Sequence, residues 1–230
     1  ARERLRRDLG RELEREWRTA YDAVRANRFE LSPAAKGARR LKSIALSYIG
    51  ASGAPDAASL AFVQFSEADN MTDRQGALTM LAHGTSDRRE AALKAFYERY
   101  RDNPLVLDKW FQTQALSARD DTPEMVEKLV RHPDFTLANP NRARSLIGAF
   151  GINQRAFHDA SGRGYRFIAD QIIALDKINP QTAAKMLPPL GRWRRFDEAR
   201  AEKMRAERER IVCTPGVSEG SDEQATRRLD

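Results

Sequence analysis

Two closely spaced arginines follow an Asn-Pro pair in the segment Asn139-Pro-Asn-Arg-Ala-Arg-Ser-Leu-Ile-Gly-Ala-Phe150. Asn is a strong helix N-cap and Pro suits the first helical position, so the segment predicts a helix that begins at Pro140. The unpaired N–H groups at that end are electropositive, and Arg142 or Arg144 would add a guanidinium that can bind a carboxylate through two hydrogen bonds. The segment therefore predicts an anion site. The alternative for Arg144 is a structural salt bridge to a neighbouring helix pair.

The residues that metal or nucleophilic chemistry requires do not occur in a familiar arrangement. The three histidines, His83, His132 and His158, are far apart in the sequence. None belongs to a His-Glu-x-x-His pair, which would place two zinc ligands one helical turn apart. Cys213 is the only cysteine, which excludes a thiolate zinc site and an internal disulfide and fits a reducing compartment. We therefore expect no catalytic residue and no metal ligand in this chain, and a packed or capping role for His158.

The N-terminal part of the chain predicts one long amphipathic helix. Leu5, Leu9, Leu13, Trp17 and Tyr21 recur every four residues with charged residues between them, which is the spacing of an apolar stripe on a helix. Further apolar segments of helical period follow along the chain. No alternating strand pattern runs for more than a few residues, so we expect an all-α protein.

Three Asn-Pro pairs mark a repeat in the second half of the chain. Asn103-Pro104, Asn139-Pro140 and Asn179-Pro180 each precede an apolar segment, and they are 36 and 40 residues apart, the length of a helix pair. This regularity predicts antiparallel helix pairs stacked in a superhelical array, an α-solenoid of the HEAT or armadillo kind. A compact helical bundle is the structural alternative.

The charge pattern of the chain argues against a nucleic acid partner, and the lengths of its apolar segments argue against a membrane. The net charge of +7 comes from 40 basic and 33 acidic residues that are interleaved along the sequence, which is typical of solvated helix faces rather than of a polyanion surface. Trp193 lies among Arg192, Arg194 and Arg195, where we expect cation–π packing rather than an aromatic–basic patch for nucleic acid. No apolar segment approaches the ~18 residues needed to span a bilayer.

Five ordered segments carry a resemblance to a known family. They are Phe65-Ser-Glu-Ala-Asp-Asn-Met-Thr-Asp73, Leu107-Asp-Lys-Trp-Phe111, the 139–150 segment, Asn179-Pro-Gln181 and Glu202-Lys-Met-Arg205. In this order and spacing, the chain from about residue 15 onward resembles the C-terminal domain of bacterial aminopeptidase N, a family of zinc-dependent exopeptidases of the gluzincin type. The resemblance implies a single α-helical domain over residues 1–230, with residues 213–230 as a loop and short helix or a flexible tail.

In that family, the zinc and the catalytic residues lie in upstream domains of a cytoplasmic enzyme, and the C-terminal helical array closes over them. The resemblance therefore implies a lid and channel-wall domain that is inactive alone. Its partners would be the N-terminal catalytic domain of the same polypeptide and peptide substrates. The start at Ala1, without an initiator Met, fits a piece of a longer polypeptide or a processed chain. The alternative is a free-standing helical-repeat scaffold that binds a protein partner.

The resemblance also implies which residues face the peptide. Arg144 matches a cavity-lining arginine, and either it or Arg142 would bind the C-terminal carboxylate of the peptide. Gln181 matches a position that contacts polar groups of the substrate; its alternative role is helix capping near Asn179. Lys185 stands where relatives often carry an arginine, so the charge is kept but the guanidinium fork is lost. Its alternative is a solvated surface position.

Overall fold

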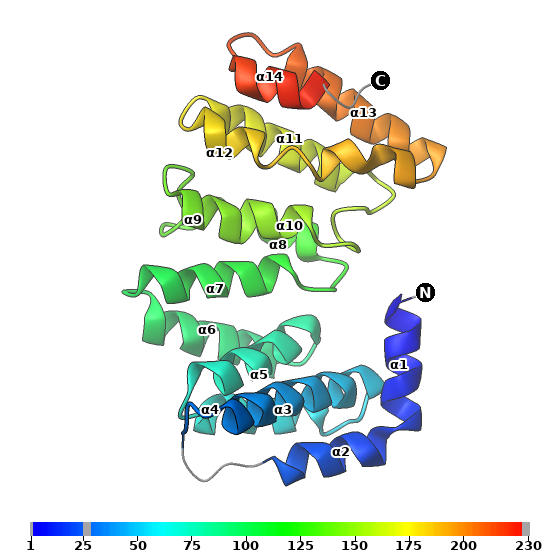
Figure 1. Cartoon of the computed structure of the whole chain (residues 1–230), viewed down its shortest axis with the longest axis vertical. Coiled ribbons are helices and arrows are strands. Elements are labelled where there is room, and N and C mark those ends of the chain that lie inside the picture. Colours follow the sequence, from blue (N-terminus) through cyan, green and yellow to red (C-terminus); the bar gives the residue numbers. More distant parts are fainter. Residues whose placement is uncertain (1, 25–28, 227–230) are drawn as a thin grey trace. The chain divides into compact units, whose positions relative to one another are not determined.

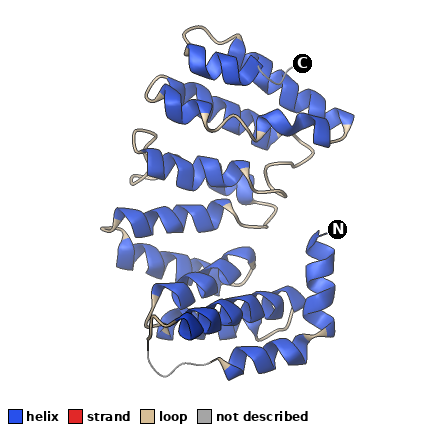
Figure 2. Ribbon diagram, viewed as in Figure 1, coloured by secondary structure: helices blue, strands red, loops and turns tan. Residues whose placement is uncertain are grey.

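The computed structural model describes residues 2–24 and 29–226. These residues form helices and loops, with no strand among them (Figure 2), which confirms the predicted all-α class. By packing, the chain divides into two compact units, Ala1–Arg99 and Tyr100–Asp230, and each unit has its own core. None of the described helices is long and apolar enough to cross a membrane.

The described residues of the first unit form six helices, which Figure 1 labels. They are α1 (Arg2–Glu12), α2 (Glu14–Ala23), α3 (Pro33–Ser52), α4 (Ala57–Glu67), α5 (Met71–His83) and α6 (Arg88–Tyr100), the last of which ends at the unit boundary. The ends of α3 follow local chemistry: Ser32 caps its start, and Gly53 ends it in the left-handed region at φ 83°. Asn70 caps α5 by accepting from the Asp73 N–H at 2.9 Å.

The predicted long N-terminal helix is wrong in one respect, because it is broken at Leu13 into α1 and α2. Both helices pack on α3. The indole of Trp17 donates to the Leu9 carbonyl at 3.2 Å and stacks on Tyr48 of α3. At Gly10 the α1 backbone approaches α3 so closely that a Cβ would lie 2.6 Å from the Tyr48 carbonyl oxygen. The break therefore lets both helices contact α3, which the local apolar period could not reveal.

The second unit contains eight α-helices, a π-helical segment and a 3₁₀ segment among its described residues. They are α7 (Pro104–Ala115), α8 (Thr122–Leu129), α9 (Pro140–Ala143), the π-helix η1 (Arg144–Gly148), α10 (Ala149–Gly151), α11 (Arg163–Asp176), α12 (Pro180–Ala184), the 3₁₀ helix η2 (Leu190–Arg195), α13 (Glu198–Val212) and α14 (Glu219–Thr226). Because α9, η1 and α10 follow without a gap, they form one continuous helix, which we call the 140–151 helix.

The three predicted Asn-Pro helix starts are confirmed. Asn103 accepts from the Val106 N–H, Asn139 from the Asn141 and Arg142 N–H groups, and Asn179 from the Thr182 N–H. A proline follows each cap at the first helical position. Each start satisfies a backbone donor that would otherwise lack a partner.

These starts define one layer of the second unit, in which α7, the 140–151 helix and α12 lie one above another (Figure 1). A second layer is formed by α8, which contacts both α7 and η1, and by α11, which contacts both α8 and α12. Aromatic residues fill the space between the helices. Trp110 and Phe111 of α7 are buried, and Phe150 packs edge-on against Phe157 and Phe167.

The C-terminal segment forms a loop and a short helix, α14, as one of the two expected alternatives for residues 213–230. Residues 227–230 lie outside the described part. Buried Asp176 of α11 accepts hydrogen bonds from the Ser218 N–H at 2.7 Å and from the Ser221 hydroxyl at 2.5 Å. Arg208 of α13, also buried, donates to the Ala225 carbonyl at the other end of α14. These contacts anchor α14 to the unit.

Candidate functional site

The 140–151 helix is buried on almost all sides, and this selects the residues that could meet a ligand. Its apolar residues Leu146, Ile147 and Phe150 are fully buried. Only Asn141 and Arg144 are exposed, while Pro140 and Gly148 are half-buried. Arg144 thus lies on a narrow solvent-facing strip of a helix that otherwise belongs to the core.

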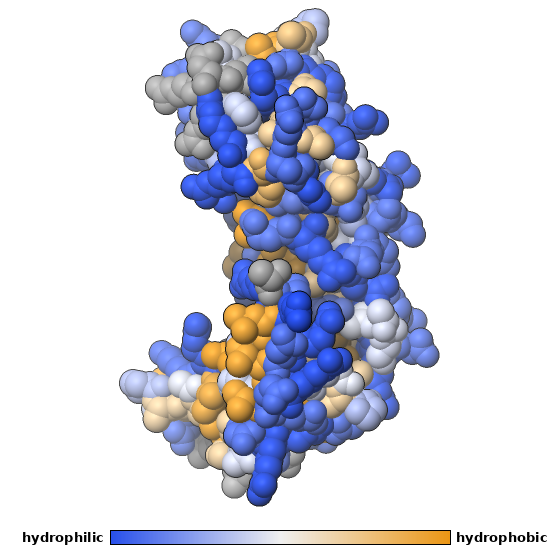
Figure 3. Space-filling view, turned by 90° about the vertical axis from the view of Figure 1, so that its right-hand side faces the viewer, coloured by the Kyte–Doolittle hydropathy of each residue, from blue (hydrophilic) through white to orange (hydrophobic). Residues whose placement is uncertain are grey.

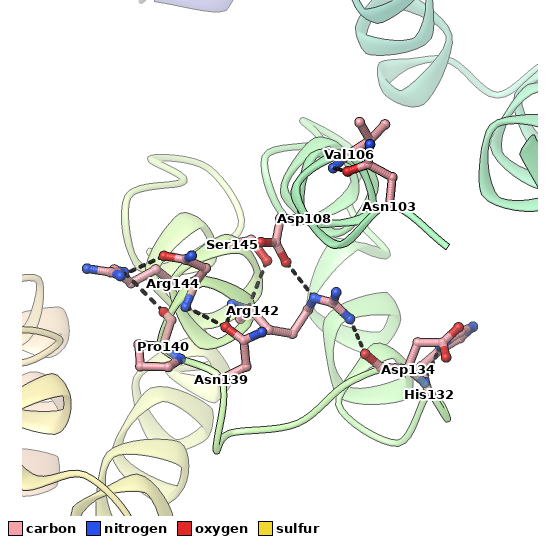
Figure 4. Close-up of polar contacts among 11 residues, drawn as sticks. Asn103, Val106, Asp108, His132, Asp134, Asn139, Pro140, Arg142, Arg144 and Ser145 are labelled. Atoms are coloured by element: carbon pink, nitrogen blue, oxygen red, sulfur yellow. Dashed lines mark hydrogen bonds and ion pairs between the residues drawn. The ribbon is translucent and has the colours of Figure 1, made fainter. Parts of the chain in front are cut away.

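The guanidinium of Arg144 is held over the first turn of its own helix (Figure 4). Its Nε donates to the Pro140 carbonyl at 3.0 Å, and its Nη2 donates to the Asn141 side-chain oxygen at 2.7 Å. Both acceptors are neutral. No carboxylate pairs with Arg144 within the described part of the chain, so its positive charge is oriented but not neutralised, as an anion site requires.

The backbone widens to a π-helix from Arg144 to Gly148. Short π segments inside α-helices are rare and occur frequently at functional sites. Here the segment begins at the arginine whose charge is unpaired. The sequence carries no local signal for this feature, because Arg-Ser-Leu-Ile-Gly also suits an ordinary α-helix.

Arg142 points the opposite way and is committed to the fold (Figure 4). It is 5% exposed. Its Nε lies 2.5 Å from an oxygen of Asp108, it donates to the Asp134 carbonyl, and its guanidinium lies over the Phe111 ring. Arg142 therefore joins α7, the 140–151 helix and the loop after α8, and its buried guanidinium already has a carboxylate partner in Asp108.

Gln181 and Lys185 are exposed on α12 and at its C-cap. The cap at the start of α12 is made by Asn179, so Gln181 is not needed for capping. Lys185 makes no ion pair with the described residues. Both therefore lie in the same layer as Arg144 with side chains free to meet a ligand.

The histidines are dispersed and packed, and no group of three or more His, Cys, Asp or Glu among the described residues could hold a metal ion. His158 is buried, its Nδ1 lies 3.1 Å from the Tyr165 hydroxyl oxygen, and its ring stacks on Phe196. Burial lowers the pKa of His158 to about 4, with a smaller effect from the Arg200 and Arg192 charges. The predicted packed role of His158 is confirmed.

The predicted cation–π packing of Trp193 is also confirmed. Arg194 and Arg205 lie 4.3 and 5.1 Å from the ring centroid. The open pocket beside the ring is lined by these two arginines and also by Glu198 and Glu202. This surface carries both positive and negative side chains, unlike the face that carries Arg144.

Comparison with known proteins gives consistent matches over the whole chain. A family model described as a domain of unknown function with ARM repeats (DUF3458_C) matches residues 1–230. The chain is 42% identical over 204 residues to aminopeptidase N of Caulobacter vibrioides, covering 87% of this chain and 23% of that protein. It is 37% identical over 229 residues to aminopeptidase N of Escherichia coli, covering 99% and 26%.

A solved structure supports the same match. The crystal structure of Legionella pneumophila aminopeptidase A in complex with aspartic acid superimposes with a TM-score of 0.89 at 31% identity, covering 100% of this chain and 28% of that one. Together with the ARM-repeat description, this confirms the predicted solenoid class. The chain spans about a quarter of the length of the curated relatives that it matches.

Proposed function

Because this chain belongs to the ARM-repeat family that forms the C-terminal domain of bacterial aminopeptidases N, we propose that it is the lid and channel-wall domain of a zinc-dependent aminopeptidase. In this proposal the intact protein removes N-terminal residues from peptides, and the partner of the domain is the catalytic domain of the same polypeptide. The unpaired thiol of Cys213 fits a reducing compartment such as the cytoplasm.

The observation that carries this proposal is the oriented, unpaired guanidinium of Arg144. A peptide that enters with its N-terminus toward the catalytic centre presents a carboxylate at its other end. Arg144 offers a charge-assisted hydrogen bond to that carboxylate from its outer edge. Gln181 adds an amide that can both donate and accept, and Lys185 adds a second cation.

The contribution of this domain to the reaction is binding and orientation. Holding the far end of the peptide limits the positions that its first peptide bond can take, which favours the reactive geometry. The zinc, held by the rest of the polypeptide, would supply an activated water. The described residues of this chain contain no site for that metal, so none of them is assigned a role in bond cleavage.

In the intact polypeptide, Arg144→Ala should lower kcat/KM for peptides about tenfold, because one charge-assisted hydrogen bond is lost. The loss for a small aminoacyl arylamide should be smaller, because that substrate has no C-terminal carboxylate. Steady-state kinetics on both substrates measure the difference.

Arg131→Ala is a matched control, because Arg131 is an exposed arginine next to α8 in the other layer. This control should leave both rates unchanged. Arg144→Lys, which keeps the charge but not the fork, should fall between wild type and Arg144→Ala. Equal losses on peptide and arylamide in Arg144→Ala would reject the carboxylate role.

A second surface supports the proposed partnership with a catalytic domain. The first unit exposes large apolar side chains, and Figure 3 shows apolar surface over it. They are Leu5, Leu13, Phe29, Leu31, Leu41, Ile44 and Val63. Exposed apolar surface favours burial against another folded domain.

A free-standing scaffold would use the same surface for a separate protein. A coding sequence that continues upstream into a His-Glu-x-x-His helix would favour the peptidase over the scaffold.

A further inference from the structure

The register between α7 and the 140–151 helix brings a further cation level with Arg144. Near their starts, Arg142 pairs with Asp108, 34 residues earlier in the chain. At the other end, the amide of Asn153, two residues past the 140–151 helix, donates at 2.9 Å to the carbonyl of Ala115, the last residue of α7 and 38 residues earlier. The two helices therefore run parallel with an offset between these values, so Arg144 lies level with residues 106–110 of α7, among which Lys109 is the exposed residue.

The next helix of the same layer continues this register. A Cβ added at Gly151 would lie 3.1 Å from the Pro189 ring, so the segment after α12 lies beside the end of the 140–151 helix. The same offset places Lys185, at the C-cap of α12, within about one helical turn of the level of Arg144. Lys109, Arg144 and Lys185 thus form a row across three successive helices.

The exposed surface of this layer is free of carboxylates. The exposed residues of α7, the 140–151 helix and α12 with its C-cap are Pro104, Leu105, Lys109, Gln112, Asn141, Arg144, Pro180, Gln181 and Lys185. They include three cations and no acid, although the chain has 33 acidic residues. Because α8 and α11 cover the opposite side, the row faces away from the second layer. Lys109 has no ion pair within the described ranges.

The distance between neighbouring cations in the row determines which differences in peptide length they can distinguish. Packed helix axes are about 8–10 Å apart, and an extended peptide advances about 3.3 Å per residue. Neighbouring cations are therefore separated by about three residues of extended peptide. We propose that Lys109 is a further carboxylate-binding residue, and that Lys109, Arg144 and Lys185 anchor the C-termini of peptides that differ in length by about three residues. This inference rests on the proposed function and adds a length preference to it.

The test uses the intact polypeptide and peptides that share an N-terminal residue and increase in length, each made as a free acid and as a C-terminal amide. The variants are Lys109→Gln, Arg144→Gln and the control Lys128→Gln, an exposed lysine of α8 in the other layer. We expect Lys109→Gln to lower the acid-to-amide ratio of kcat/KM about threefold to fivefold. The affected lengths should differ by about three residues from those affected by Arg144→Gln, and Lys128→Gln should change no ratio.

A second readout separates binding from turnover. N-acetylated peptides lack the free amine that an aminopeptidase requires, so their inhibition constants report binding alone. The free acids should lose affinity in Lys109→Gln at the same lengths, and Lys109→Arg should restore it. If Lys109 had only a structural role, Lys109→Gln would lower the affinity for acids and for amides equally. That result would overturn the inference.

The inference and the proposed function fail in different ways. If Lys109→Gln lowers the acid-to-amide ratio at no peptide length, or at the same lengths as Arg144→Gln, the length preference is wrong. The carboxylate role of Arg144 then still stands. If Arg144→Gln also leaves the acid-to-amide ratio unchanged at every length, the proposed function of this face is wrong as well.

Discussion

Two arginines separated by one residue have opposite environments in this protein, and helical geometry explains why. Each residue turns an α-helix by about 100°, so positions two apart point to nearly opposite sides. Arg142 faces Asp108 and Phe111, whereas Arg144 faces solvent. The sequence identifies an arginine-bearing helix start but cannot choose between the two, because the acid that binds Arg142 lies on another helix. Only the packing of α7 decides which guanidinium is available to a ligand.

At the same scale, buried His158 should make stability depend on pH. Its pKa in the folded protein is lowered to about 4, against about 6.5 in an unfolded chain. Between these values the unfolded chain binds more protons than the folded one, so protonation favours unfolding. The free energy of unfolding should therefore fall as the pH drops from about 6.5 to about 4, by roughly 3 kcal/mol from this residue.

Urea unfolding of wild type and His158→Phe over this pH range measures the effect. The variant should lose part of the pH slope, because Phe has no proton to gain. Burial also lowers the pKa values of His83 and His132. These two residues still contribute to the pH slope in His158→Phe, so His83→Phe provides a comparison. An unchanged slope in His158→Phe would show that His158 is not the residue that titrates.

At the scale of the element, the sequence predicts helix starts well and breaks in helices poorly. The starts at Asn103, Asn139 and Asn179 depend on a cap and a proline within a few residues, which is local information. The break at Leu13 accompanies the packing of both α1 and α2 on α3, where Trp17 stacks on Tyr48, and the π segment lies in a helix that is almost wholly buried. Both features occur where the helix contacts distant parts of the chain, and the local apolar pattern does not mark either of them.

The last helix, α14, illustrates how buried charges can hold a short element. A helix of eight residues is not stable alone. The Asp176 carboxylate lies at its positive N-terminal end, and the Arg208 guanidinium lies at its negative C-terminal end. Each charge complements the helix dipole. Although burial raises the pKa of Asp176, hydrogen bonds from Ser218 and Ser221 outweigh it and keep that pKa below its usual value.

We therefore expect Asp176→Ala to release α14 from the second unit. The charged hydrogen bonds contribute about 1.5–3 kcal/mol, and their loss leaves the hydroxyl of Ser221 without its buried acceptor. Hydrogen exchange of the α14 amides should accelerate by about tenfold or more, while exchange in α7 stays unchanged. Asp170→Ala, an exposed carboxylate on the same helix, is the control. Slow exchange of α14 in Asp176→Ala would show that apolar packing alone holds it.

At the scale of the whole molecule, the chain has an exposed cationic face, and its described residues contain no group that could hold a metal ion. Zinc in proteins needs three or four ligands at about 2.0–2.3 Å. His132 and His158 instead contact aromatic rings, and His83 lies at the end of α5. The chain spans about a quarter of the length of the curated relatives that it matches. The division of labour in the proposal therefore places recognition of the peptide's far end in this chain and cleavage elsewhere.

The isolated 230-residue chain should accordingly bind no stoichiometric zinc and hydrolyse no aminoacyl arylamide. A lone histidine or carboxylate gives only weak, exchangeable metal contacts, so dialysis against micromolar zinc should leave less than one ion per chain by elemental analysis. The isolated chain should still bind N-acetylated peptide acids more tightly than the amides, because Arg144 is oriented by its own helix. Tight binding of one zinc per chain would contradict this division. Peptide binding without discrimination between acid and amide would instead place carboxylate recognition outside this domain.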